Sequence, residues 1–233
     1  MSQGTSLLVV CTGNICRSPA VELLMRRRLD RTVTVSSAGT HALAGQPVSP
    51  PMAELLRARG VDPSGFTART LRPAMVEEAD LVVTLTVAQR AAVVRMVPAA
   101  VRRTFTLLEM AQLLSTSPGP VPAPGGDGAR WAQVPALVMT ERSVHLGSGH
   151  ALDVSDPYRR PDRVYRRTLD QITAALDTVW SVVADPQTRE RIAESSWQPS
   201  ISDRSEQPYR FEQPDVSRAA PGRPRHGRRP RWL

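Results

Sequence analysis

The two cysteines of this chain lie close together in the segment VVCTGNICRSP (9–19). Cys11 ends an apolar run, and Arg17 follows six positions later. A loop from a buried strand to a helix N-terminus directs several backbone N–H groups at one point, where the helix dipole also favours negative charge. Such a loop binds phosphate, and its N–H groups would stabilise the thiolate of Cys11. The segment therefore predicts a sulfur nucleophile that faces a bound phosphorus atom.

The other residues of this loop suit the same chemistry. Gly13 permits backbone conformations that a Cβ would hinder, and Asn14 tolerates the left-handed region and can brace the loop through its side chain. Arg17 offers a planar fork for two phosphate oxygens. Together these residues predict in-line attack by Cys11 on a phosphate monoester. The resulting cysteinyl phosphate would be hydrolysed by water, and the loop would need no metal ion.

Strand and helix patterns alternate around this loop. Strands are expected at 6–11, 32–39, 79–85 and 103–108, and helices at 19–29, 50–60, 87–96 and 162–183. Ser18 is expected to cap the first helix, with Pro19 at the first helical position. The alternation predicts an α/β fold: a three-layer, doubly wound, four-stranded parallel sheet with helices on both faces, of the flavodoxin-like or Rossmann-like kind. Ligands bind at the carboxyl ends of such strands, where Cys11 lies.

Composition divides the chain into two parts. A folded domain is expected over 1–186, with an extended loop at 115–154 in which 131–142 forms a short helix. A disordered tail is expected over 187–233, where Pro, Arg and Ser dominate. The last 18 residues hold six arginines and no acidic residue, so they supply most of the formal net charge of +8. The nearly neutral remainder argues against a nucleic-acid-binding core, whereas the tail is either solvated or contacts an acidic partner.

Several other classes of protein are not expected. No apolar stretch approaches the roughly 20 residues that span a membrane. Two neighbouring cysteines without secretory features favour a reducing, cytoplasmic setting. No metal site or other cofactor is expected, because the four histidines have no ligand spacing: His41, His145, His150 and His226.

The nine residues Cys-x-Gly-Asn-x-Cys-Arg-Ser-Pro (11–19) resemble the low-molecular-weight protein tyrosine phosphatases. The likeness extends over roughly residues 5–185, through SSAGT (36–40), ADLVVTLT (79–86) and Asp-Pro-Tyr (156–158). It implies an enzyme that hydrolyses phosphotyrosine in protein substrates. It also implies that Cys11, Arg17 and Asp156 are catalytic, with Asp156 as the general acid and then the base.

The resemblance assigns further roles. Substrate-binding residues would be Thr12, Gly13, Asn14, Ile15, Cys16, Ser18 and Tyr158. Ser18 would hydrogen-bond the leaving Cys11 sulfur, and Ser37 would help Asn14 to hold the loop. Cys16 would trap oxidised Cys11 as a reversible disulfide.

This chain also differs from the family pattern, and two other functions stay open. Leu43 is the nearest equivalent of an aromatic residue that relatives place against the substrate ring, and Phe66 stands where many carry a histidine. One alternative is an arsenate reductase on the same scaffold, which would need an external thiol because no cysteine follows Cys16. The other is a phosphate-site binding or regulatory module without turnover.

Overall fold

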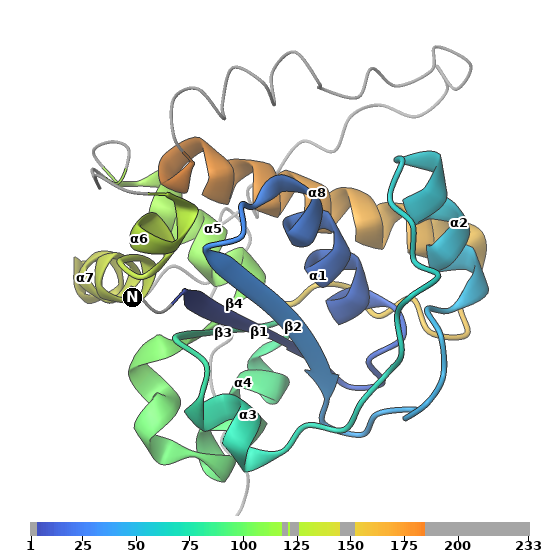
Figure 1. Ribbon diagram of the computed structural model, residues 1–233, viewed down its shortest axis with the longest axis horizontal. Helices are drawn as coiled ribbons and strands as arrows, with labels where there is room; N and C mark the ends of the chain where they lie inside the picture. The colour runs from blue at the N-terminus through green and yellow to red at the C-terminus, as the bar shows by residue number, and fades with distance from the viewer. Residues whose placement is uncertain (1–3, 118–120, 122–125, 145–151, 185–233) are drawn as a thin grey trace, which may run out of the picture. The chain divides into compact units, whose positions relative to one another are not determined.

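A four-stranded parallel sheet forms the centre of the computed structural model, with the strand order β2-β1-β3-β4 (Figure 1). The structure describes residues 4–117, 121, 126–144 and 152–184. The strands are β1 (Thr5–Cys11), β2 (Val33–Gly39), β3 (Leu81–Thr84) and β4 (Thr104–Thr106). Cys11 pairs with Gly39 at the carboxyl end of the sheet, where the loop to the first helix begins.

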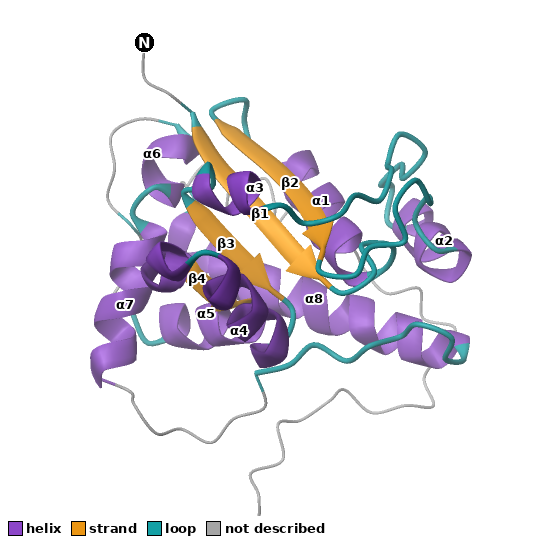
Figure 2. Cartoon of the chain, turned by 90° about the horizontal axis from the view of Figure 1, so that it is seen from below, coloured by secondary structure: helices purple, strands orange, loops and turns teal. Residues whose placement is uncertain are grey.

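Helices cover both faces of this sheet, as Figures 1 and 2 show. One face carries α1 (Arg17–Arg28), α2 (Pro50–Ala58), α5 (Leu107–Ser115) and α8 (Asp162–Val183). The other carries α3 (Pro73–Glu77), α4 (Val87–Met96) and the 3₁₀ helix η1 (Pro98–Arg103). Two further helices, α6 (Asp127–Trp131) and α7 (Val134–Val144), precede α8. None of the helices in the described part of the chain combines the length and apolarity needed to cross a membrane.

Alternation along β1 places its side chains in two separate cores. Leu7, Val9 and Cys11 face the core beneath α1 and α8, whereas Leu8 and Val10 face the core beneath α3 and α4. All five side chains are at most 2% exposed. Because strands buried on both faces read as continuous apolar runs, this burial explains the run that leads to Cys11.

The predicted fold class is confirmed, but some elements differ from the prediction. The prediction that Ser18 caps the first helix is wrong, because α1 begins at Arg17 and the Ser18 hydroxyl is directed to Cys11. The fourth strand ends at Thr106 rather than at residue 108. Thr106 and Glu109 form a capping box, with the Thr106 hydroxyl accepting the Glu109 N–H and the Glu109 carboxylate accepting the Thr106 N–H, and this starts α5.

Within the segment 115–154, α7 lies close to the short helix expected at 131–142, whereas α6 was not expected. α6 is attached to the amino ends of β1 and β2. The N–H of Asp30 donates to the Asp127 carboxylate and the N–H of Asp127 donates to the Asp30 carboxylate. The N–H of Gly128 donates to Thr32 Oγ1 at 2.8 Å, and its carbonyl accepts the Thr5 hydroxyl at 2.7 Å. All described residues belong to one compact unit, and the tail predicted at 187–233 lies outside them.

Candidate active site

The Cys11 sulfur lies at the base of the loop that joins β1 to α1. Its Sγ accepts the Ser18 hydroxyl at 2.9 Å and the Asn14 N–H at 3.2 Å. The Cys11 side chain is buried, so these two donors face the sulfur in a site with little water. Two hydrogen-bond donors are therefore directed at the sulfur of the predicted nucleophile.

Backbone N–H groups of the same loop are available for a ligand. Those of Gly13, Ile15 and Cys16 donate to no other residue that the structure describes. They precede the first turn of α1, whose own N–H groups have no intrahelical partner. A phosphate group bound here would satisfy several of these donors together, and the helix dipole would favour its charge.

Asn14 is the brace of the loop. Its backbone has a φ of 54°, a left-handed conformation that asparagine tolerates better than most residues. Its Nδ2 donates to the hydroxyls of Ser18 (2.9 Å) and Ser37 (2.8 Å), and its Oδ1 accepts the N–H of Arg69 at 2.9 Å. The side chain is completely buried. The loop is therefore held to both β2 and the segment that follows α2.

Glu22 is the last member of this chain of hydrogen bonds, which runs from Asn14 through Ser37. The Ser37 hydroxyl donates to Glu22 Oε2 at 2.6 Å, and Arg26 forms an ion pair with Glu22 Oε1 at 3.0 Å. Burial raises the pKa of this carboxyl, whereas the Ser37 hydroxyl and the Arg26 charge lower it. Sequence analysis missed Glu22, although an acidic residue inside the apolar segment AVELL was a signal that its side chain needs buried partners.

Arg17 and Asp156 meet at the mouth of the loop. Arg17 is nearly buried, and its guanidinium lies 2.7 Å from Asp156 Oδ2 and 3.4 Å from the Val154 carbonyl. The Asp156 side chain is 52% exposed. The N–H of Val154 donates to the Leu85 carbonyl at 2.8 Å, so the end of β3 fixes the segment that carries Asp156. Residues 139 positions apart in sequence are thus brought to the same phosphate loop.

The mouth has three side chains directed to solvent: Thr12, Leu43 and Tyr158. The N–H of Leu43 donates to the Gly13 carbonyl at 3.0 Å, and the N–H of Tyr158 donates to Asp156 Oδ1 at 3.2 Å. Leu43 is 41% exposed and Tyr158 is 40% exposed, whereas most large apolar side chains in the described part of the chain are buried. One apolar and one aromatic side chain are therefore exposed on the segments that contact the Gly13 carbonyl and Asp156.

Gln89 at the start of α4 also supports the loop, and sequence analysis did not identify it. The N–H of Leu85 donates to Gln89 Oε1 at 3.0 Å, which fixes the amide so that its Nε2 donates to Thr12 Oγ1 at 3.1 Å. The Gln89 side chain is 5% exposed. Because a buried amide needs partners, Gln89 ties Thr12 to the end of β3.

Cys16 lies in the same loop as Cys11, but its side chain has different surroundings. Both cysteines are free thiols. Cys16 is hydrogen-bonded to the Ser49 hydroxyl at 3.0 Å, and burial raises the pKa of its thiol to about 11. Cys16 is therefore a protonated thiol near neutral pH. The substrate-binding role of Cys16 stays a prediction: its buried side chain is hydrogen-bonded to Ser49, and its N–H donates to no other residue that the structure describes.

Comparisons with known proteins agree with this geometry. The family model described as "Low molecular weight phosphotyrosine protein phosphatase" matches residues 6–145. A probable low molecular weight protein-tyrosine-phosphatase, EpsP of Ralstonia nicotianae, is 40% identical over 46% of this chain and 73% of its own length. A protein-arginine-phosphatase of Geobacillus stearothermophilus is 26% identical over 73% of this chain and 90% of its own length.

A solved structure agrees as well. The low molecular weight protein tyrosine phosphatase from T. tengcongensis is 27% identical, with a TM-score of 0.54 over 76% of this chain and 97% of that protein. The family match covers more than half of the chain and contains the whole Cys11–Arg17 loop, as the nine-residue motif led us to expect. This chain therefore belongs to the low molecular weight phosphotyrosine protein phosphatase family.

Proposed function

We propose that this protein hydrolyses phosphotyrosine in protein substrates through a cysteinyl-phosphate intermediate. The observation that carries the proposal is the Cys11 sulfur, which accepts hydrogen bonds from Ser18 and Asn14 in a loop whose Gly13, Ile15 and Cys16 N–H groups have no acceptor among the described residues. The family match, the relatives named protein-tyrosine-phosphatases and the exposed ring of Tyr158 support a phosphotyrosine substrate.

In the first step the Cys11 thiolate attacks phosphorus, and an S–P bond forms while the bond from phosphorus to the phenolic oxygen breaks. Arg17 binds two phosphoryl oxygens through its fork, so the phosphate dianion replaces Asp156 as its partner. Asp156 gives its proton to the leaving oxygen, and the products of this step are cysteinyl phosphate and the free tyrosine hydroxyl.

In the second step the Asp156 carboxylate takes a proton from water as the water oxygen attacks phosphorus. The S–P bond breaks, inorganic phosphate leaves and the thiolate returns. Ser18 supports this departure because its hydroxyl is already 2.9 Å from the sulfur. Thr12, Gly13, Asn14, Ile15 and Cys16 bind the phosphoryl oxygens chiefly through backbone N–H groups, and Tyr158 borders the substrate ring.

Cys16 has a protective role in this proposal. If a peroxide oxidises Cys11 to a sulfenic acid, the Cys16 sulfur forms an S–S bond with it while the sulfenic hydroxyl leaves with the Cys16 proton as water, and a cellular thiol reduces this disulfide again. The raised pKa of Cys16 keeps it protonated during turnover, so it does not compete with Cys11 for substrate.

The experiment compares wild type, Cys11→Ser and Cys16→Ser on five substrates: p-nitrophenyl phosphate, a phosphotyrosine peptide, a phosphoserine peptide, phosphoarginine, and arsenate with an added thiol. We expect phosphotyrosine and p-nitrophenyl phosphate to be hydrolysed by wild type and Cys16→Ser but not by Cys11→Ser, which should still bind vanadate. Preference for phosphoarginine, or arsenate-dependent consumption of thiol, would assign the site to those substrates instead. Vanadate binding without hydrolysis of any substrate would indicate a binding module.

A further inference from the structure

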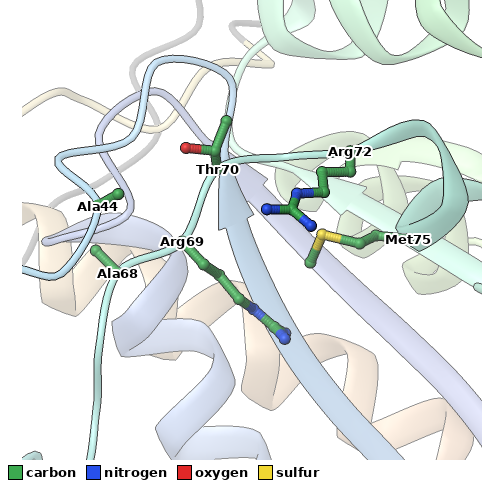
Figure 3. Close-up of a pocket in the computed structure, with 6 residues that line it drawn as sticks. All are labelled: Ala44, Ala68, Arg69, Thr70, Arg72 and Met75. Carbon is green, nitrogen blue, oxygen red and sulfur yellow. The ribbon is translucent and has the colours of Figure 1, made fainter.

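A hollow of about 420 Å³ opens beside the phosphate loop (Figure 3). Two segments form it, the loop that follows β2 and the stretch from Ala68 to Met75, which runs into α3. The lining residues are Ala44, Ala68, Arg69, Thr70, Arg72 and Met75. Arg69 also braces the phosphate loop through its backbone N–H, whereas the other lining residues have no part in the phosphate site described above, and none of the six is acidic.

Hydrogen bonds attach both walls of the hollow to the phosphate loop. On one wall, the N–H of Leu43 donates to the Gly13 carbonyl at 3.0 Å, and Ala44 is the next residue. On the other, the N–H of Arg69 donates to Asn14 Oδ1 at 2.9 Å. An extended peptide advances about 3.3 Å per residue. A peptide whose phosphotyrosine occupies the loop therefore reaches the hollow within a few residues.

The two arginines of the hollow are placed differently. The Nε of Arg69 donates to the Ser37 carbonyl at 2.7 Å, and Figure 3 shows its side chain extended along β2. Arg72 is exposed and forms no ion pair with any residue that the structure describes. Its guanidinium lies toward Thr70 and Met75 in Figure 3. Arg72 therefore provides an unpaired positive charge at a mostly apolar hollow.

We propose that this hollow is a substrate subsite for an acidic side chain close to the phosphotyrosine. The carboxylate of an Asp or Glu would pair with Arg72, and the methylene groups of that side chain would lie on Ala44, Ala68 and Met75. Charge complementarity selects this occupant, because the hollow offers a cation and no carboxylate. This proposal rests on the proposed function, since it needs a phosphopeptide held in the phosphate loop.

The test measures kcat/KM for phosphotyrosine peptides in which Asp, Ala or Lys occupies each position from four before to four after the phosphotyrosine. Wild type is compared with Arg72→Ala, Arg72→Lys and Arg72→Glu, and with Arg95→Ala, which removes an exposed arginine from the far end of α4. Hydrolysis of p-nitrophenyl phosphate, which has no flanking residues, normalises each variant. We expect wild type to prefer Asp over Ala at one or two positions by roughly twofold to fivefold, the range of an exposed ion pair.

This preference should disappear in Arg72→Ala, persist in Arg72→Lys and Arg95→Ala, reverse toward Lys in Arg72→Glu, and weaken as salt is added. The subsite proposal is overturned if wild type shows no preference for Asp, or if Arg72→Ala keeps that preference. In either case, continued hydrolysis of p-nitrophenyl phosphate leaves the proposed function intact. If wild type hydrolyses none of the substrates, the proposed function is refuted, and the subsite proposal is refuted as well. A change of sedimentation in Arg72→Glu without a change in peptide preference assigns the hollow to a second copy of this chain and overturns the proposal.

Discussion

Replacement of Asn14 by alanine tests the brace of the phosphate loop most directly. The change removes three hydrogen bonds, those of Nδ2 with Ser18 and Ser37 and that of Oδ1 with the Arg69 N–H. Because Asn14 is completely buried, water does not readily replace the lost partners. The change also places an alanine at a φ of 54°.

The expected loss of stability follows from these terms. Three buried hydrogen bonds at about 1 kcal/mol each contribute about 3 kcal/mol. The left-handed backbone adds about 1 kcal/mol for alanine, so the free energy of unfolding should fall by about 4 kcal/mol. Asn14→Gly is the matched control, since glycine removes the same hydrogen bonds but adopts this φ freely. It should be about 1 kcal/mol more stable than Asn14→Ala.

Urea denaturation measures the stability, and hydrolysis of p-nitrophenyl phosphate measures the function of the loop. We expect kcat/KM to fall about 10²-fold in both variants, because displacement of the loop misplaces the nucleophile. The reasoning would be refuted by an alanine variant within 1 kcal/mol of wild type, or by a glycine variant less stable than the alanine variant. Unchanged kcat/KM in a destabilised variant would show that the brace stabilises the fold but does not position Cys11.

Three further predictions concern other groups of the site. Asp156→Asn should lower kcat by about 10² to 10⁴ for substrates with poor leaving groups and much less for p-nitrophenyl phosphate; a uniform loss across leaving groups would contradict the acid role. Burial raises the pKa of Cys16 from 9.0 to about 11, so the native state holds this proton more tightly than the unfolded state. The resulting stabilisation is fully present below pH 9 and is lost as the pH rises through 11. Between pH 8 and 12, the free energy of unfolding of wild type should therefore fall by up to about 3 kcal/mol more than that of Cys16→Ala, as measured by urea titrations. Equal falls in the two proteins would contradict this prediction. Gln89→Leu should cost about 1 to 2 kcal/mol in the same assay, because it removes the hydrogen bonds of Gln89 with the Leu85 N–H and with Thr12, although the Val10 carbonyl still accepts that N–H; Gln89→Glu, which keeps an acceptor for Leu85, should cost less, and equal losses would argue against this role.

The phosphate loop could be predicted because its residues are local in sequence. Cys11, Gly13, Asn14 and Arg17 lie within seven positions, and each has a residue type that the loop conformation or the phosphate charge requires. The α/β class was equally accessible, since the apolar runs and helical patterns alternate along the chain. Asp156 could be placed only through the family resemblance, because no local pattern connects it with a loop 139 residues earlier.

The supporting residues were harder to predict, because distant elements supply them. Ser49 and Gln89 become partners of the loop only when the chain has folded, and their sequence neighbourhoods give no sign of this. The helix α5 was missed although TLLE (106–109) has the spacing of a capping box, because the apolar residues Leu107 and Leu108 extend the strand pattern. Short helices such as α3 were missed because five residues contain little periodicity.

The docking of α6 gives the molecule two independent ends. Asp30 and Asp127 join this helix to the amino ends of the strands, whereas the proposed active site lies at their carboxyl ends. Fusion partners or spectroscopic labels introduced near α6 would thus report on the protein without disturbing turnover.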